Sequence, residues 1–176
     1  MASKIDKDLK KKLEKIKLIV LDVDGVLTDD SIFVGPEGTE FKRFFVSDGL
    51  AIRLLTLLDV DTGIISARHS PATDARTKEL KIPYVYQEYD KVKCLREMME
   101  KAGVKPDEVC FMGNDILDIE VMNIAGVSAC PSDAVPEVIE VADVRTNKAG
   151  GHGAVRELYE MVAAARGKTL AELVPI

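Results

Sequence analysis

The sequence predicts an α/β domain built on a Rossmann-like, doubly wound parallel sheet. Short apolar runs, such as the one that leads into Asp22, are typical of strands buried on both faces of a parallel sheet. These runs alternate with segments of helical length, about ten residues each. Reactive polar residues follow several of the runs, where such sheets bind ligands. At 176 residues the chain is one domain with a sizeable core.

The first predicted strand begins at Lys17 and runs into the acidic sequence Asp22-Val-Asp24-Gly25. Side chains two apart on a strand point the same way, so Asp22 and Asp24 are expected to converge at the carboxyl end of this strand. Two converging carboxylates repel each other unless a cation or a shared proton is present. The alternative is that both acids only cap a turn, but turn chemistry does not require two acids after a buried strand.

A hairpin is predicted after this strand, with arms at residues 31–34 and 39–46 around the turn Gly35-Pro-Glu-Gly38. The arms carry more aromatic residues than a thin ribbon can bury alone, namely Phe33, Phe41, Phe44 and Phe45. The hairpin therefore either folds over its own domain or pairs with other subunits.

The remaining elements alternate between strand and helix. Short apolar runs predict strands at residues 60–65, 84–86, 109–112 and 127–129, and an edge strand at 142–144. Apolar residues at helical spacing and helix-start signals predict helices at residues 47–58, from 70 onward, and at 90–102, 118–125, 135–140 and 153–165. Ser70-Pro71 illustrates a helix start, because a capping residue precedes proline in the first turn.

Three parts of the chain are predicted: a charged leader at residues 1–15, the domain at 16–170 with the hairpin flap at about 31–46, and a tail at 171–176. The leader is lysine-rich, which is typical of a solvated helix or a frayed end, with a partner-binding arm as the alternative. No insertion is large enough for a separate cap domain.

Composition excludes several classes of protein. Hydrophobic residues make up 47% of the chain and charged residues 31%, as in globular proteins. A net charge of −6 and the lack of a basic stripe argue against a nucleic-acid partner. No apolar run approaches the roughly 18 residues that span a membrane, and the first residues lack a secretory signal core, so no membrane insertion is expected. The 3 cysteines are widely spaced, which suits reduced thiols, and we expect a cytoplasmic protein.

The segment from Asp22 to Thr28, Asp-Val-Asp-Gly-Val-Leu-Thr, resembles the first motif of the haloacid dehalogenase superfamily of aspartate-nucleophile phosphatases. The flanking sequence is similar to a cap-less branch, the 3-deoxy-D-manno-octulosonate 8-phosphate (KDO-8-phosphate) phosphatases, over residues 16–170. The similarity continues through residues 45–50, 65–68, 113–115 and 150–157. It implies that the hairpin helps to wall the active site and builds a homotetramer.

A phosphoryl-transfer site needs the residue types found after these strands. A phosphate monoester is doubly negative, so cations must neutralise it before a carboxylate can attack. Mg²⁺ takes oxygen ligands, and a lysine with a hydroxyl can hold the other phosphate oxygens.

The resemblance implies a role for each of these residues. Asp22 is the nucleophile and Asp24 the general acid and base, assisted by Lys91. Ser66 and Lys91 bind the phosphoryl group. Mg²⁺ is held by Asp22, by the main-chain oxygen of Asp24 and by Asn114. Asp115 and Asp118 either support these ligands or replace one of them.

Three departures from the family pattern concern this site. Asn114 stands where the family has an acid; asparagine still offers an oxygen, but the site loses a charge and Asp115 is the alternative ligand. The usual glycine before Lys91 is missing, and Ala67 replaces a glycine.

The predicted substrate is a small phosphorylated sugar acid, whose carboxylate Arg68 and Arg76 could bind, with Arg156 as a further contact. An arginine at the position of Arg68 goes with KDO-8-phosphate in the resembled branch, and hence with lipopolysaccharide biosynthesis. Ser47 points instead to the related phosphatases of sialic-acid-like 9-phosphates.

Two classes besides a phosphatase remain as alternatives. A degenerate phosphatase kept as a tetrameric scaffold is favoured only by Asn114. A response-regulator receiver would carry its acceptor aspartate on a middle strand, whereas the Asp22 pair lies on the first.

Overall fold

A six-stranded parallel sheet forms the centre of the protein in the computed structural model, which describes residues 6–175. The strand order is β5-β4-β1-β6-β7-β8. The strands are β1 (Leu18–Leu21), β4 (Asp61–Ser66), β5 (Tyr84–Gln87), β6 (Val109–Met112), β7 (Val127–Cys130) and β8 (Val144–Arg145). Strand β1 lies between β4 and β6, and the chain extends the sheet first on one side of β1 and then on the other. The predicted doubly wound α/β sheet is confirmed.

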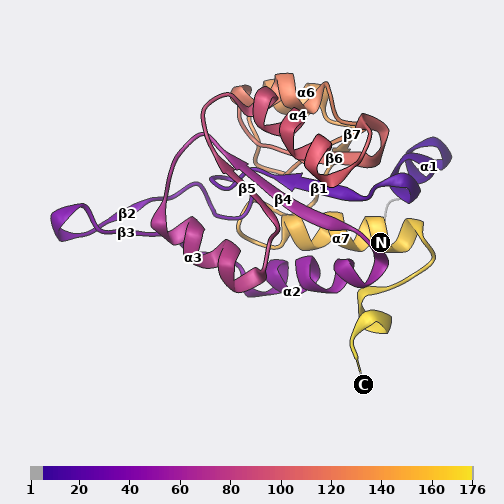
Figure 1. Cartoon of the computed structure of the whole chain (residues 1–176), viewed down its shortest axis with the longest axis horizontal. Helices are drawn as coiled ribbons and strands as arrows, with labels where there is room; N and C mark the ends of the chain where they lie inside the picture. Colours follow the sequence, from indigo (N-terminus) through magenta and orange to yellow (C-terminus); the bar gives the residue numbers. More distant parts are fainter. Residues whose placement is uncertain (1–5, 176) are drawn as a thin grey trace.

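Helices cover both faces of this sheet (Figure 1). On one face lie α2 (Val46–Leu55), α3 (Pro71–Leu80) and α7 (Ala154–Ala165). Helix α1 (Lys7–Lys15) lies at the end of the sheet and adds Leu13 to the core on this face. On the other lie α4 (Lys91–Ala102), α5 (Ile119–Met122) and α6 (Pro136–Val141). Short 3-10 turns follow α2 (Thr56–Leu58), precede β6 (Pro106–Glu108) and α5 (Ile116–Asp118), and close the chain (Leu170–Leu173). The helix expected at 118–125 is therefore shorter than predicted and starts as a 3-10 turn.

The burial of β1 explains why its sequence is apolar throughout. Ile19 and Leu21 belong to the core beneath α2 and α7, whereas Leu18 and Val20 belong to the core beneath α4 and α5. All four side chains are fully buried, because the alternation of a strand sends successive residues to opposite faces.

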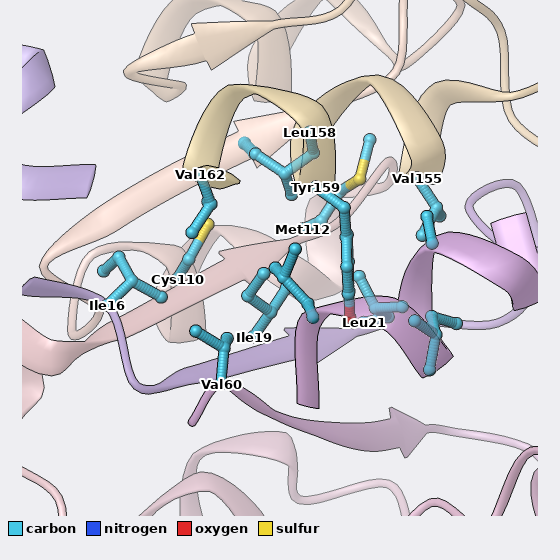
Figure 2. Packing of buried hydrophobic residues seen from close by; sticks show 14 of the residues in the cluster. Ile16, Ile19, Leu21, Val60, Cys110, Met112, Val155, Leu158, Tyr159 and Val162 are labelled. Carbon is cyan, nitrogen blue, oxygen red and sulfur yellow. The ribbon is translucent and has the colours of Figure 1, made fainter. Parts of the chain in front are cut away.

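Helix α7 closes the first of these cores (Figure 2). Its residues Val155, Leu158, Tyr159 and Val162 point toward the side chains of β1 and β6. The Tyr159 hydroxyl shares a hydrogen bond of 2.8 Å with the Thr62 hydroxyl, which satisfies both groups inside the core.

The hairpin is present but shorter than predicted: β2 (Phe33–Val34) pairs antiparallel with β3 (Glu40–Phe41) around a 3-10 turn at Pro36–Gly38. It projects from the body of the domain (Figure 1). Phe33 and Phe41 are mostly exposed, whereas Phe44 packs against the core. Within one copy of the chain, the hairpin tip does not bury its aromatic residues.

Within the described residues, one short element lies next to each predicted boundary of the domain. In the predicted leader, residues 1–5 lie outside the described part and residues 7–15 form α1, which buries Leu13. Lys12 pairs with Asp143 and thus ties this helix to the domain. The 3-10 turn at Leu170–Leu173 likewise buries Leu170. Among the described residues, we find no helix with the length and apolar character needed to cross a bilayer.

Candidate active site

A cavity of about 190 Å³ opens at the carboxyl ends of β1, β4 and β6, where the strand order reverses. Most of its lining residues have polar or charged side chains; the residues are Asp22, Asp24, Asp30, Ser66, Ala67, Arg68, Lys91, Asn114, Asp115 and Leu117. The fold therefore brings together Asp22, Asp24, Ser66, Lys91 and Asn114, as predicted, because parallel strands end at the same edge of the sheet.

A tight turn after β1 places the two acids. The carbonyl of Val23 accepts backbone hydrogen bonds from the amides of residues 26, 27 and 28. Thr28 closes the turn, because its hydroxyl donates to the same carbonyl at 3.3 Å and accepts from the Gly25 amide at 3.4 Å. Gly25 adopts a φ of +81°, a conformation that costs glycine little. The turn therefore leaves Asp22 nearly buried and Asp24 partly exposed to the cavity.

A buried ion triad stands at the floor of the cavity. The Lys91 ammonium lies 3.1 Å from Asp22 Oδ2 and donates to Asp118 Oδ1 at 2.6 Å. The second oxygen of Asp118 accepts from the backbone amides of Asn114 and Asp115 at 3.0 and 3.2 Å. Asp118 thus holds both the lysine and the loop after β6 in place, and it does not line the cavity itself.

The electrostatics of this triad are those of a reactive site. Burial, reinforced by the charge of Asp118, raises the pKa of Asp22 to about 7, although Lys91 acts in the opposite direction. Burial would lower the pKa of Lys91, but the two carboxylates outweigh it and raise that pKa. The lysine therefore remains a cation, and the Asp22 carboxylate is left with less stabilisation than a paired acid usually has.

Asn114 supplies the clearest indication of a cation site. Its Oδ1 is buried and has no hydrogen-bond partner among the described residues, and the side chain lies against Gly25 beside the acids. Buried polar atoms are normally paired, so an unpaired amide oxygen next to carboxylates fits a hard cation such as Mg²⁺. In residues 6–175 no three His, Cys, Asp or Glu side chains converge as a metal site. The ligand set that the family resemblance implies, Asp22 with the Asn114 amide and a main-chain oxygen, does not need three such side chains.

Two further predicted ligands, Ser66 and Asp115, also lie at the cavity. Ser66 ends β4 at the cavity, and its hydroxyl accepts from the Arg68 amide at 3.3 Å. Asp115 also lines the cavity, where its carboxylate caps the following turn by accepting from the Ile116 amide at 2.6 Å. A capping role and a role near the cation are compatible at this position.

Two of the predicted substrate-binding arginines do not line the cavity in one copy of the chain. Arg76 pairs with Glu79 at 2.8 Å and lies over the Phe44 ring. Arg156 pairs with Glu160 on the surface of α7 at 2.8 Å. Arg68, in contrast, lines the cavity and reaches toward Asp24, with Nε 3.7 Å from Oδ2. Contact of Arg76 or Arg156 with a substrate remains a prediction.

Sequence reasoning missed Asp30, Glu40 and Lys42. Asp30 lines the cavity, and burial followed by the charge of Asp24 raises its pKa. Lys42 donates to Asp24 Oδ1 at 2.6 Å, and Glu40 pairs with Arg68. Glu40 and Lys42 are two residues apart on the second arm of the hairpin, so the sequence could place them on one face of it. No pattern in the nearby sequence indicated that this face contacts Asp24 in the turn after β1.

Comparison with known proteins identifies relatives of this chain. A sequence profile of haloacid dehalogenase-like hydrolases matches residues 71–158. A 3-deoxy-D-manno-octulosonate 8-phosphate phosphatase of Escherichia coli (strain B / BL21-DE3) is 38% identical over 165 residues, which cover 93% of this chain and 88% of the relative.

Solved structures agree with this match. The 3-deoxy-D-manno-octulosonate 8-phosphate phosphatase from Yersinia pestis superimposes with a TM-score of 0.91 at 34% identity, covering 93% of this chain and 89% of that chain. The corresponding phosphatase from Moraxella catarrhalis, in complex with a magnesium ion, a phosphate ion and a KDO molecule, gives a TM-score of 0.88 at 34% identity and covers 92% and 93% of the two chains.

The contact between Gly25 and Asn114 yields a prediction. A Cβ at position 25 would lie 2.0 Å from Asn114 Nδ2, so Gly25→Ala must displace the amide. We expect its Mg²⁺ affinity, measured by isothermal titration calorimetry, to fall at least about tenfold, which corresponds to roughly 1.4 kcal/mol. Gly38→Ala is the matched control, because Gly38 has a φ of +76° with nothing within 4 Å of the added atom. Unchanged Mg²⁺ binding by Gly25→Ala would contradict the assignment of Asn114 as a ligand.

Asp48 yields a second prediction, on stability. The side chain is buried in α2, its Oδ1 accepts from the Arg156 amide at 2.8 Å, and burial raises its pKa to about 6. The folded protein therefore holds this proton to a higher pH than the unfolded chain does, and stability falls as pH rises from the unfolded value toward the folded one. Asparagine does not ionise, so it does not lose stability in this pH range. The free energy of unfolding of Asp48→Asn, relative to that of the parent, should therefore rise by about 2 kcal/mol from about pH 4.5 to about pH 8.

Urea unfolding of the parent and of Asp48→Asn at both pH values measures this difference. Subtracting the two proteins at each pH cancels the contributions of the other titratable groups. A difference that does not change with pH would show that the Asp48 pKa is not raised.

Proposed function

This chain belongs to the haloacid dehalogenase-like hydrolases, in the family of the 3-deoxy-D-manno-octulosonate 8-phosphate phosphatases, and we propose that it hydrolyses that sugar-acid phosphate with Mg²⁺ as cofactor. The observation that carries the proposal is the buried triad of Asp22, Lys91 and Asp118 beside the unpaired Asn114 oxygen. These groups meet where a phosphate monoester needs a nucleophile, a cation and a metal site.

The chemistry proceeds in two steps at the cavity. An Asp22 oxygen attacks phosphorus, the bond from phosphorus to the sugar oxygen breaks, and Asp24 gives its proton to that leaving oxygen. Water then attacks the resulting aspartyl phosphate, Asp24 takes a proton from the water, and the bond between phosphorus and Asp22 breaks. Inorganic phosphate leaves, and both carboxyl groups return to their starting protonation states.

The surrounding residues supply charge and position. Bound Mg²⁺ neutralises phosphate charge, and Asp22, the main-chain oxygen of Asp24 and Asn114 would hold it. Lys91 contributes a fixed positive charge beside Asp22, and the Ser66 hydroxyl donates to a phosphate oxygen. Asp118 keeps the lysine ionised and correctly placed, so it acts through Lys91 without reaching the phosphate.

Arg68 is the residue that favours the eight-carbon substrate. It lines the cavity with its guanidinium next to Asp24 and paired with Glu40, and the N–H groups that these partners leave unused can bind the carboxylate of a sugar acid. The cellular setting we propose is cytoplasmic lipopolysaccharide biosynthesis; it is supported by the name of the relative, which gives the 8-phosphate of this sugar acid as its substrate. The alternative substrate is a sialic-acid-like 9-phosphate, suggested by Ser47.

The hairpin supports a further part of the proposal, a homotetramer in which β2 and β3 of neighbouring copies contact each other. Phe33 and Phe41 are 57% and 60% exposed, and Val34 is 74% exposed, so the tip presents an apolar surface that water disfavours. Burial of this surface between copies would also bring other subunits toward the cavity. Arg76 and Arg156, which do not line the cavity of their own chain, could then contact the substrate of a neighbouring copy.

Phosphate release tests the proposed reaction. With Mg²⁺, we expect kcat/KM for KDO-8-phosphate to exceed that for N-acetylneuraminate 9-phosphate by at least about tenfold. Both substrates carry a carboxylate, but a contact with Arg68 that fits the eight-carbon chain would be misplaced on the nine-carbon chain, at a cost of roughly 1.4 kcal/mol or more. Asp22→Asn should lower kcat by about 10⁴-fold or more, because the amide cannot attack phosphorus. Glu140→Gln, on the surface of α6, is the control for a charge-removing substitution.

Each remaining outcome of this assay changes a different part of the proposal. Preference for the nine-carbon substrate would keep the chemistry and replace the substrate. Release from neither substrate at saturating Mg²⁺ would favour the non-catalytic scaffold and point to Asn114 as the cause.

The oligomeric state tests the role of the hairpin. Phe41→Ser should convert a tetramer to smaller species at micromolar concentration, because it removes an apolar anchor from the contact. Leu57→Ser is the matched control, since Leu57 is 58% exposed after α2, away from the hairpin. Light scattering after size-exclusion chromatography reads the mass directly. A parent protein that is monomeric, or a Phe41→Ser variant that is still tetrameric, would contradict this arrangement.

A further inference from the structure

Lys42 is a buried cation that the reaction described above does not use. It follows β3 in the hairpin, and its side chain is 0% exposed. The ammonium donates to Asp24 Oδ1 at 2.6 Å and lies 3.7 Å from Glu40 Oε1. A lysine shielded from water in this way is stable only when carboxylates pair with it, so its placement at Asp24 is a specific feature of the fold.

The contact constrains the Asp24 carboxylate. A charge-assisted hydrogen bond of this length engages Oδ1, which leaves Oδ2 as the oxygen available for proton transfer. Oδ2 is 3.7 Å from Arg68 Nε, and both residues line the cavity. Proton transfer to a leaving oxygen requires this orientation, because general acids act only within hydrogen-bond reach.

We propose that Lys42 is the positioning residue for Asp24, and that the hairpin thereby orients the general acid and base of the reaction. The inference rests on the proposed function, since it assumes that Asp24 exchanges a proton with the leaving sugar oxygen. Lys42 itself touches Asp24 and not the reacting phosphorus.

Glu40 completes this unit from the same face of the hairpin. Its carboxylate pairs with Arg68 and accepts from the Ser70 hydroxyl at 2.7 Å. The Ser70 hydrogen bond, followed by Arg68, lowers the pKa of Glu40, which keeps it ionised. On one arm of the hairpin, Lys42 thus holds the acid that transfers the proton, and Glu40 holds the arginine beside that acid.

Kinetics of Lys42→Met on two phosphate esters test the inference. KDO-8-phosphate leaves as an alkoxide and needs a proton from Asp24, whereas p-nitrophenyl phosphate releases a stable phenolate and does not. Lys42→Met keeps an unbranched side chain only one atom shorter and removes its charge. Lys17→Met is the matched control, because Lys17 pairs with Glu108 at the same distance, 2.6 Å, at the opposite end of β1.

For Lys42→Met we expect kcat on KDO-8-phosphate to fall between about tenfold and about 100-fold, with KM changed less than about threefold. On p-nitrophenyl phosphate, kcat/KM should stay within about threefold of the parent, because it reports only the steps up to the first phosphoryl transfer. Lys17→Met should match the parent on both substrates. Should Lys42→Met fail to fold, Lys42→Arg displaces the cation with the charge kept and should lose activity in the same substrate order.

Three results would overturn the inference. A rise in KM for KDO-8-phosphate with kcat unchanged would mean that Lys42 binds the substrate carboxylate. Equal losses on both esters would mean a general structural role, and no loss on either would mean no role in the reaction. Failure of the parent protein to hydrolyse KDO-8-phosphate would instead refute the proposed function, which separates the two outcomes.

Discussion

The carboxylates of Asp22 and Asp118 meet across a single ammonium, that of Lys91, in a part of the molecule nearly closed to water. The arrangement is stable only because each partner satisfies another, and removal of any one would leave a buried charge unpaired. It joins the end of β1, the start of α4 and the loop after β6, so three segments far apart in the chain depend on it. The position of the Asn114 loop, and with it the proposed cation site, follows from the hydrogen bonds that Asp118 accepts.

The sheet makes this triad possible and also limits its composition. Strand β1 is buried on both faces, so its residues must be apolar until the strand ends. Polar side chains can first appear at the turn after it, which is also the place where the strand order reverses. The apolar core beneath α7 and the reactive groups above it are therefore two consequences of one topology.

The hairpin adds a second layer of control. It carries an apolar tip that one copy of the chain leaves exposed, and a polar base that reaches Asp24 and Arg68. An element that contacts other subunits at its tip and the general acid at its base would connect assembly to catalysis without any motion of the sheet. This connection depends on Glu40 and Lys42, which are two residues apart on the same arm and therefore point to the same side of it.

Local periodicity determined the sheet and the succession of strands and helices along the chain, because both follow from residues close in sequence. It also predicted that Asp22, Asp24, Ser66 and Asn114 gather at one edge, since each follows a predicted parallel strand. Periodicity did not predict how short the hairpin strands are or that α1 packs against the domain. Nor did it predict that Arg76 and Arg156 pair with residues outside the cavity. The tertiary structure alone decided that Lys91 binds Asp118, 27 residues away, and that Lys42 binds Asp24, 18 residues away. Such pairs are set by how the elements pack, since no spacing in the chain distinguishes one lysine from another until the fold has buried it between acids.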